Sequence, residues 1–426
     1  MSAQTLQITS RRSSTETRRP NDLHRGFIAG IILLVGLAGF CRGDLVIEST
    51  DGPVTSGEIA GFKQFMSAAV YRGDNNHNNM VYGKAGDAAE ALGLMYEITR
   101  DRQILDQFVK LADIMIAGRN DPVKGRILWT GNRELAWPND PDSTDQYLYA
   151  GEENGDVIGH ICYCAKLILD EKSLWSEKCP GGGTYLDRAK TYVRECDRTI
   201  DSYLLPNFVN AENDLYRSPT SPLFARLGDR AARSIGKSVP WNQQMMLNNG
   251  FQRLAECHAI LGDDPKRVAR YDAIVKASCD AFLASLVHYE VKGHDCVKWS
   301  YAADDKTLHY VEDAAHGGYD LLLYRCYYSG RYGIKKESLI PLANTVMYVI
   351  NRGDGTFATR VDGVSKGAPA TSLRPTYLRM CAFLPDLWPI ASKPALKRAK
   401  QEPLLTAEIL WMKYYRNRGK FPEPGE

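Results

Sequence analysis

The chain has 426 residues, of which 53 are Lys or Arg and 51 are Asp or Glu, so its formal net charge is only +2 at pH 7. A balance this close to neutral gives no basic field of the kind that gathers nucleic acid, and no long run of cations marks a membrane-binding patch. We therefore expect neither a nucleic-acid partner nor a stable membrane partner, and any polyanionic ligand must be held by locally placed Arg and Lys.

The beginning of the chain has the pattern of an export signal. Five arginines precede an apolar run at residues 27–40, which is followed by Cys41. This order is typical of a secretory signal, and the apolar run is shorter than the roughly 20 residues of a membrane span. An uncleaved anchor and a lipoprotein attached through Cys41 are the alternatives. We expect a leader at residues 1–43, one catalytic domain at residues 44–426, and a secreted or periplasmic location.

Nine cysteines follow Cys41. Export would permit disulfides, but an odd number leaves at least one thiol free. Cys257, Cys279 and Cys326 lie in apolar patterns with helical spacing, where a buried free thiol is the commoner outcome.

Beyond the leader, apolar residues recur at helical spacing in pairs of segments. The paired segments are 84–100 with 102–117, 152–169 with 185–205, 241–262 with 265–287, 306–328 with 336–350, and 369–387 with 404–415. Five or six helical hairpins in series predict an all-α fold, an (α/α) toroid or incomplete barrel with long polar and aromatic loops. The first helix of each pair would line the centre and the second would form the outer ring. An irregular, open α-solenoid is the competing architecture.

The stretch 306–328 carries the densest group of ionisable side chains beside an apolar helix. Interpreted as a helix entry, it places His309, Glu312 and His316 on one face, because three- and four-residue spacings stack along a helix. Gly317 and Gly318 are poor helix residues, so keeping both indicates a close approach at that point. A capped helix N-terminus with satisfied histidines is the structural alternative.

If the inner helices line a centre, the polar residues at their N-terminal ends converge on one cleft. Asn-rich and aromatic loops before these helices could form its lip. The substrate-binding candidates from these loops and helix ends are His77, Trp137, Glu153, Asn154, Asn242, Asn248, Asn249 and Arg374. For most of them a purely structural role is the alternative, such as an amide ladder between helices or an aromatic side chain that anchors a loop.

Five motifs follow one another along the chain: a polar NNHNN loop, a GEENGD helix start, WNQQMMLNNG, WSY followed by HYVEDAAHGGYD, and a final RPTYLR. In this order the chain resembles the secreted α/α-toroid enzymes that act on uronic-acid polysaccharides, and most of all polysaccharide lyase family 38. The likeness covers most of residues 57–415. It implies cleavage of alginate or glucuronan, with a tyrosine as a proton carrier. Part of the pattern also resembles the helical domain of glucuronyl epimerases.

A 4-linked uronate is cleaved by β-elimination when a base removes the C5 proton and an acid protonates the departing O4. The substrate carboxylate must first be neutralised, because negative charge develops beside it. We assign this neutralisation to Glu312, Arg374 and Asn248 or Asn249. As proton carriers, Tyr377 and Tyr301 compete for one role, and His316 or His309 could fill the other.

Three other functions remain as alternatives. A glycoside hydrolase of the same fold, of the unsaturated-uronyl type, needs paired carboxylates, which Glu153, Asp156, Glu312 and Asp313 could supply. A glucuronyl epimerase would share the first proton transfer, and a non-catalytic glycan-binding protein would use only the aromatic loops. We expect no cofactor and no metal, because two histidines seven residues apart are far apart for one ion.

Overall fold

A computed structural model describes residues 45–68 and 84–425. The chain divides into two compact units, Met1–Cys41 and Arg42–Glu426, and all described residues belong to the second. The expected leader and His77 lie outside the described residues. No helix in the described part of the chain is long and apolar enough to cross a membrane.

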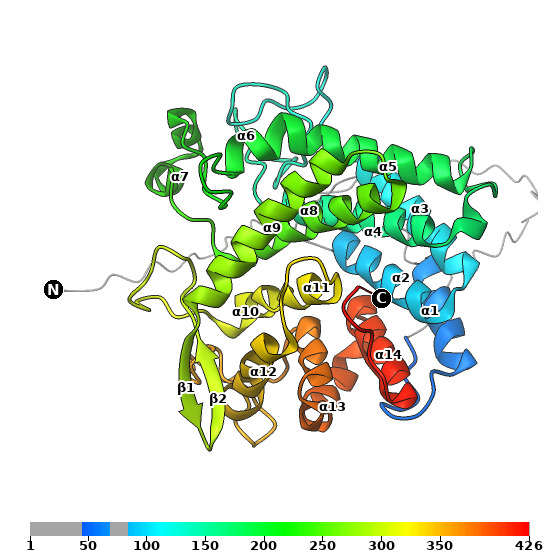
Figure 1. The fold of residues 1–426 in the computed structure, drawn as a ribbon, viewed down its shortest axis with the longest axis vertical. Helices are drawn as coiled ribbons and strands as arrows, with labels where there is room; N and C mark the ends of the chain where they lie inside the picture. Colours follow the sequence, from blue (N-terminus) through cyan, green and yellow to red (C-terminus); the bar gives the residue numbers. More distant parts are fainter. Residues whose placement is uncertain (1–44, 69–83, 426) are drawn as a thin grey trace, which may run out of the picture. The chain divides into compact units, whose positions relative to one another are not determined.

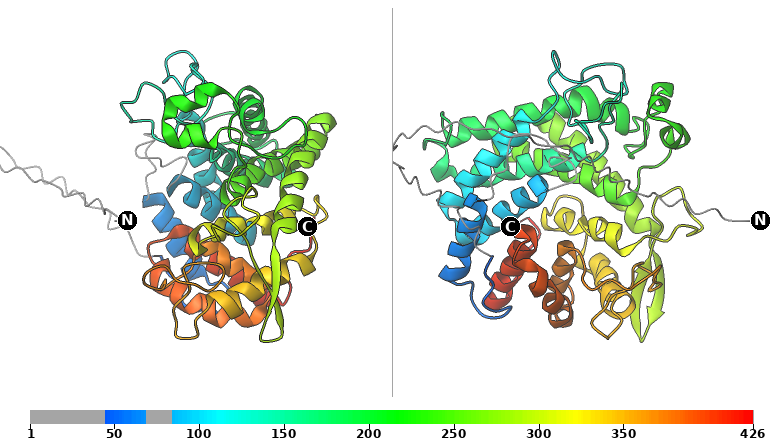
Figure 2. Two further views of the ribbon diagram at one scale, coloured as in Figure 1. Left: turned by 90° about the vertical axis from the view of Figure 1, so that its left-hand side faces the viewer. Right: turned by 180° about the vertical axis from the view of Figure 1, so that it is seen from behind.

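The described chain is almost entirely helical, which confirms the all-α prediction (Figure 1). The helices are α1 (Ser56–Ala68), α2 (Lys84–Thr99), α3 (Arg102–Ala117), α4 (Asn154–Asp170), α5 (Tyr185–Thr199), α6 (Leu205–Phe208), α7 (Asp229–Ser234), α8 (Trp241–Leu261), α9 (Pro265–Ser285), α10 (Ala314–Asp320), α11 (Leu323–Tyr328), α12 (Lys336–Thr345), α13 (Trp388–Ala399) and α14 (Pro403–Arg418). A 3₁₀ helix, η6 (Pro375–Ala382), and one antiparallel hairpin of β1 (Val287–Val291) and β2 (His294–Lys298), which packs on α12, complete the elements used below (Figure 2).

Helix ends coincide with local capping signals. The side chain of Asp101 accepts a hydrogen bond from the main chain of α3, and Gly118 ends that helix. Thr184 and Asp187 form a reciprocal capping box at the start of α5. Because such caps satisfy main-chain groups that a helix end leaves unpaired, the predicted boundaries of these hairpins agree closely with the structure.

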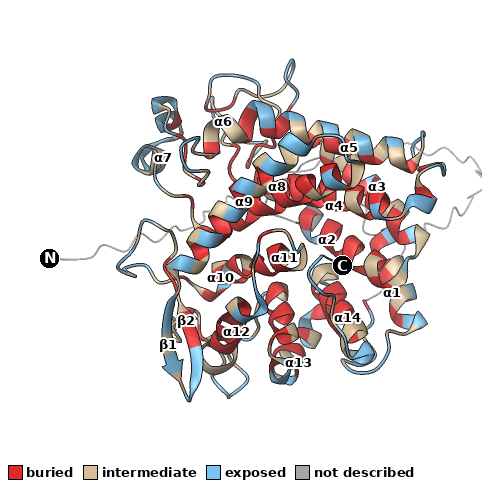
Figure 3. Cartoon of the chain, viewed as in Figure 1, coloured by how far each residue is buried: buried red, intermediate tan, exposed pale blue. Residues whose placement is uncertain are grey.

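Within the described residues, six inner elements form a closed ring. In sequence order they are α2, α4, α8, the α10–α11 pair, η6 and α14. Each contacts the next, and α14 returns to contact α2. The inner helices α4 and α8 are buried on nearly every side, whereas α5 and α9 bury one stripe and cover the ring from outside (Figure 3). A helix that is apolar all round belongs in a core and an amphipathic one at a surface, so the ring is a toroid and not an open solenoid.

The last hairpin differs from its prediction. The segment 404–415 was expected in the outer ring, but α14 is an inner helix, with Ile409, Leu410 and Met412 fully buried. The outer partner of η6 is α13, which contacts both η6 and α14. Pro389 and Pro394 lie within α13. Because proline normally breaks a helix, the sequence pattern did not predict a helix there.

The start of α10 also differs from its prediction. Residues 309–313 are not helical: the main chain of Glu312 bonds to Trp299 on one side and to Val361 on the other. Asp313 caps the helix by accepting hydrogen bonds from the main chain of Ala315 and His316. The predicted single helical face is therefore wrong, because the chain is extended up to the cap.

All nine cysteines within the described residues are buried free thiols, as expected for those in helical apolar patterns.

Candidate functional site

The inner helices run in parallel, so their N-terminal ends meet at one end of the ring. Near this end, Gln243 of α8 donates to Glu153 at the start of α4, with 2.7 Å between Nε2 and Oε1. One turn further along, Asn249 donates to Asp156, with 2.7 Å between Nδ2 and Oδ1. Asp87 in the first turn of α2 shares electrostatic interactions with Asp156 and Arg374. Four elements, α2, α4, α8 and the entry to η6, thus place polar side chains around one opening.

A cavity of about 700 Å³ lies at the α10 side of this opening. It is lined by Tyr301, Glu312, Asp313 and His316, and by the entry to η6 at Arg374. Its cationic lining residues are Arg230, Arg360, Lys366, Arg374 and Arg398. Two of these cations bind acids outside the cavity lining, Arg360 to Asp362 and Arg398 to Glu402.

Glu312 and Asp320 form a buried acid pair at the base of this cavity. The residues are 1% and 0% exposed, and their carboxyls share a hydrogen bond in which protonated Glu312 donates to Asp320. The indole Nε1 of Trp299 donates to Asp320 Oδ2 at 2.7 Å. Burial, and then the neighbouring Asp320 carboxylate, raise the pKa of Glu312 far above its usual 4.5. Glu312 is therefore a neutral hydrogen-bond donor at neutral pH.

Asp313 and His316 form a second pair, nearer to solvent. His316 Nδ1 lies 2.7 Å from Asp313 Oδ2, and both side chains are a little under half exposed. This hydrogen bond raises the pKa of His316 above its usual 6.5. Because Nδ1 faces the carboxylate, the other ring nitrogen, Nε2, is left to exchange a proton with a ligand.

Tyr301 lies against His316, with 5.7 Å between the ring centroids. Burial, followed by the nearby Glu312, raises the pKa of Tyr301 to about 12. Its phenol is therefore protonated at neutral pH. A protonated phenol and a titratable imidazole thus lie side by side on one cavity wall.

Arg374 stands between this cavity and the acids of α2 and α4. Its guanidinium lies 4.5 Å from the ring centroid of Tyr319 and donates to the Tyr319 hydroxyl at 3.1 Å. The aliphatic part of Arg374 packs against Gly318, where an added Cβ would lie 3.0 Å from Arg374 Cδ. The sequence predicted that a backbone comes close at the glycine pair; the neighbours are instead the side chains of Val361, Trp299, Arg374 and Tyr377.

The other predicted proton carriers lie away from the cavity wall. Tyr377 is 1% exposed and its hydroxyl donates to the main-chain oxygen of Ala314 at 2.8 Å. His309 is exposed and lies edge-on to Tyr310, with 4.5 Å between the ring centroids. The structure thus brings together Tyr301, Glu312, His316 and Arg374, and separates His309 and Tyr377 from them.

The predicted substrate-binding residues divide between the opening and the protein interior. Glu153 and Asn249 lie near the opening, and the buried Asn242 has an amide oxygen with no partner among the described residues. Asn248 faces the outer ring instead, because Tyr216 donates to its oxygen and its amide donates to Ser278.

Asn154 and Trp137 hold the loop that precedes α4. The Asn154 oxygen accepts from the main chain of Trp137 at 2.7 Å, and its amide donates back to the Trp137 oxygen at 3.0 Å. The Trp137 ring is fully buried and its Nε1 donates to the main chain of Met115. This ring has no exposed face on which a sugar could stack.

Some residues of the opening were not singled out from the sequence. Asp87 carried a usable signal, because it lies in the first turn of a predicted inner helix. Its side chain reaches solvent but is closely surrounded by protein, and this crowding raises its pKa to about 6, with His160 acting in the opposite direction. Arg230 comes from the short helix α7 and Arg360 from an irregular segment, and no periodicity in the sequence indicates that these residues meet.

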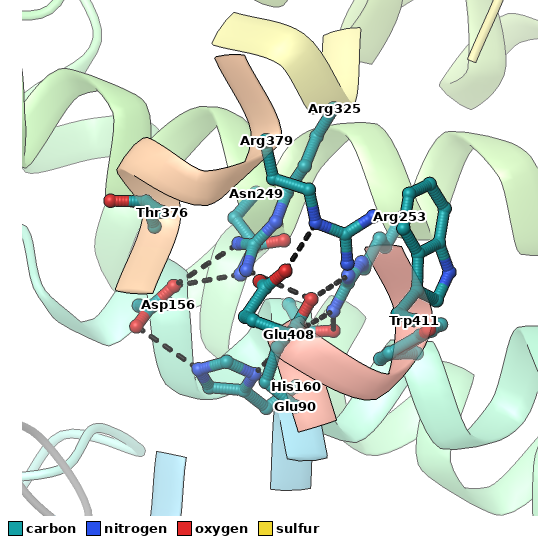
Figure 4. Close-up of polar contacts among 12 residues, drawn as sticks. Glu90, Asp156, His160, Asn249, Arg253, Arg325, Thr376, Arg379, Glu408 and Trp411 are labelled. Carbon is teal, nitrogen blue, oxygen red and sulfur yellow. Dashed lines mark hydrogen bonds and ion pairs between the residues drawn. The ribbon is translucent and has the colours of Figure 1, made fainter. Parts of the chain in front are cut away.

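A layer of buried charges crosses the ring below the opening (Figure 4). Glu90 binds both Arg253, at 3.1 Å, and Arg325, at 2.9 Å. His160 joins Glu90 to Asp156, with Nδ1 3.3 Å from Glu90 and Nε2 3.1 Å from Asp156. Burial opposes charge on Asp156, but His160, Arg325 and Asn249 together outweigh it and lower the pKa of this carboxyl.

Among the described residues, Glu312, Asp313 and His316 are the one group with ligand atoms close enough to share a metal ion, all within 4.8 Å. Both carboxylate oxygens of Asp313 are already engaged, Oδ1 by main-chain N–H groups and Oδ2 by His316 Nδ1. This use of the oxygens fits a capped helix and a polarised histidine better than a metal centre.

No protein-family model and no curated protein matches the chain. Among solved structures, Rex8A from Paenibacillus barcinonensis complexed with xylose is similar, with a TM-score of 0.40 and 13% identity over 85% of this chain and 95% of that one. A mutant of Rex8A complexed with 3(3)-alpha-L-arabinofuranosyl-xylotetraose gives a TM-score of 0.45 and 13% identity, over 83% and 92% of the two chains. Similarity at this level identifies no family for the chain.

Proposed function

We propose that this protein is an exported polysaccharide lyase that cleaves a 4-linked uronic-acid polymer, alginate or glucuronan, by β-elimination. The observation that carries the proposal is the cavity of about 700 Å³ in which Tyr301 and His316 lie together among five cationic side chains. Cations attract a polyuronate, and a neutral Glu312 does not repel it. Of the two carboxyls that line the cavity, Glu312 is neutral, and Asp313 is charged but bonded to His316.

In the proposed reaction, Arg374 and the protonated Glu312 bind the substrate carboxylate and stabilise charge that develops there. Neutral His316 takes the C5 proton on Nε2. The electrons of the C5–H bond form the C4–C5 double bond while the C4–O4 bond breaks. Tyr301 gives its proton to O4, so no water is consumed.

The test is ultraviolet absorbance at the band of a conjugated uronate while the purified protein is mixed with alginate, glucuronan and related uronans in turn. We expect absorbance to rise with one polymer. The rate of this rise should be about 10² to 10⁴ times lower for Tyr301→Phe and for His316→Asn, because each variant lacks one proton carrier. Tyr310→Phe, on the rim of the same cavity, is the matched control. A flat trace with every polymer contradicts the proposal.

A glycoside hydrolase is a second candidate, favoured by one observation. The carboxyls of Asp87 and Asp156 have pKa values displaced in opposite directions, with Asp87 raised to about 6 and Asp156 lowered. Glycoside hydrolysis requires one carboxyl as the acid and another as the base, and surroundings that separate their pKa values provide this pair. In this case Asp87→Asn would abolish turnover while Tyr301→Phe would leave most of it, the reverse of the result expected for the lyase.

A further inference from the structure

A second and larger cavity, of about 940 Å³, lies at the other end of the ring. It is lined by the C-terminal halves of the inner helices, including Asp170 of α4 and Arg418 of α14, and by Arg100 directly after α2. Glu90, Arg253 and Arg325, from the charge layer of Figure 4, line it as well. None of these residues lines the cavity assigned to the uronan.

Cations outnumber carboxylates around this second cavity. The cationic lining residues are Arg100, Lys166, Arg253, Arg325, Arg331, Arg379, Arg418 and Lys420, and the acidic ones are Glu90, Glu97, Asp170 and Glu256. Two further acids bind from outside the lining, Asp272 to Arg331 and Glu408 to Arg379. The positive charge is therefore only partly neutralised by the protein.

Three observations show where the unneutralised charge lies. Glu90 alone serves two guanidiniums, those of Arg253 and Arg325. At the rim, Arg100 and Arg418 form no ion pair with any described residue. Arg100 lies over the ring of Tyr96, and Arg418 lies over the ring of Tyr414 and donates to its hydroxyl at 2.9 Å. Cationic donors are thus available both deep in the cavity and at its rim.

The inner part of the cavity also contains buried donors without acceptors. Tyr324 is 3% exposed, yet its hydroxyl has no hydrogen-bond partner among the described residues. Arg325 Nε and Nη1 have no acceptor at hydrogen-bond distance among the described residues; Nη1 lies 4.0 Å from an oxygen of Asp156, and the Arg325 side chain interacts with the neighbouring Tyr324. Buried polar groups are normally satisfied, so three such donors lining one cavity indicate an absent acceptor.

We infer that this cavity binds a small anion with at least two carboxylate or phosphate groups. One group would accept from Tyr324 and Arg325 in the interior, and another would meet Arg100 and Arg418 at the rim. Arginine suits both groups, because its planar fork binds either oxyanion in a bidentate manner. This binding is independent of the proposed lyase reaction, since the two cavities share no lining residue.

Helix C-termini offer a competing explanation for the rim. They carry partial negative charge, which cations in the last turn complement. That explanation accounts for Arg100 and Arg418 but not for the unpartnered hydroxyl of Tyr324 inside the cavity. Tyr324→Phe therefore separates the two explanations, because it removes one donor and no charge.

The experiment is isothermal titration calorimetry of the full chain with citrate and, separately, with inorganic pyrophosphate, at constant ionic strength. We expect saturable binding of at least one probe, and the stronger of the two identifies the carboxylate or the phosphate class. Tyr324→Phe should raise Kd about tenfold, and Arg100→Gln combined with Arg418→Gln by more. Arg194→Gln, an exposed cation outside both cavities, should leave Kd unchanged.

Arg374→Gln locates the binding, because Arg374 lines only the uronan cavity. Its Kd should equal that of the wild type. The inference is overturned if neither probe gives heat above dilution, if Arg374→Gln abolishes binding, or if Tyr324→Phe and the double rim variant both bind as the wild type does. Circular dichroism of each variant confirms that it is folded, so a loss of binding cannot come from unfolding.

Discussion

His316 and Tyr301 hold their protons in different electrostatic settings. The carboxylate of Asp313 raises the pKa of His316, whereas burial and Glu312 raise the pKa of Tyr301 to about 12. Across the neutral range the phenol keeps its proton while the imidazole titrates. This difference assigns the base role to His316 and the acid role to Tyr301 in the proposed elimination.

The pH profile of the reaction follows from this assignment. Neutral His316 is the active form, so kcat/KM should rise with pH on a limb whose apparent pKa lies above 6.5. Asp313→Asn removes the charge that raises this pKa but retains a good helix cap, and should move the limb to lower pH. If the limb keeps its position in Asp313→Asn, His316 is not the base.

The raised pKa of Glu312 also makes the stability of the folded protein depend on pH. Its pKa is raised in the folded protein, so the unfolded chain loses this proton first, from pH 4.5 upward, and the folded state loses stability as pH rises above that value. Glu312→Gln should therefore be more stable than the wild type above pH 4.5, with a difference that grows with pH. Urea unfolding at several pH values measures it. The exposed Glu290→Gln is the control, and a difference independent of pH would show that Glu312 is charged.

The helices α4 and α8 approach each other closely enough to exclude side chains. A Cβ added at Gly155 would lie less than 3.0 Å from main-chain atoms of Met246 and Leu247, and one at Gly250 would lie equally close to the main chain of Gly155. Main-chain atoms cannot move aside as a flexible side chain can. This contact fixes the position of the neighbouring Asp156 relative to α8.

Gly155→Ala should accordingly lower the free energy of unfolding by about 1–3 kcal/mol, the usual effect of overpacking. It should also reduce turnover, because α4 and α8 must separate at the opening. Gly57→Ala, in the first turn of α1, is the control. The only close contact of its Cβ would be with the flexible end of the Glu48 side chain. Urea denaturation followed by circular dichroism compares them, and equal stabilities would contradict the close-contact explanation.

Elements with an uninterrupted apolar period were predictable from the sequence, and the others were not. The pairs α2–α3 and α8–α9 match their predictions because helical periodicity and capping residues agree. The helix α13 was missed because of its two prolines, and the extended entry to α10 because its acids and histidines have helical spacing. Glu312 and His316 were found as chemistry-bearing residues, but their surroundings depend on Val361 and Arg360, which no local pattern connects to them.

An ion pair ties the last helix of the ring, α14, to α1, which is not one of the six ring elements. Lys413 of α14 donates to both oxygens of Glu58 in α1, at 2.8 and 2.9 Å, and both side chains are at most 1% exposed. Glu58 also accepts from the main chain of Glu48 and Thr55. No sequence pattern predicts a pair separated by 355 residues.

Removing one partner of this buried pair leaves a buried charge without compensation. Glu58→Gln should lower the free energy of unfolding by about 3–5 kcal/mol. Asp280→Asn in the exposed Lys276–Asp280 pair should lower it by about 0–1 kcal/mol. Thermal and urea unfolding compare the two variants, and similar losses would show that the Glu58–Lys413 pair does not stabilise the docking of α1 on α14.

The proposed function is the cleavage of a glycosidic bond without water. Labelling with heavy oxygen tests this step. The reaction is run with the cleaved uronan in water labelled with heavy oxygen, and the new chain ends are analysed by mass spectrometry. Elimination predicts products that lack the mass of one water and carry no label from the bond-breaking step. A saturated product that has taken up heavy oxygen during cleavage would contradict the lyase and assign the reaction to Asp87 and Asp156 as a hydrolysis.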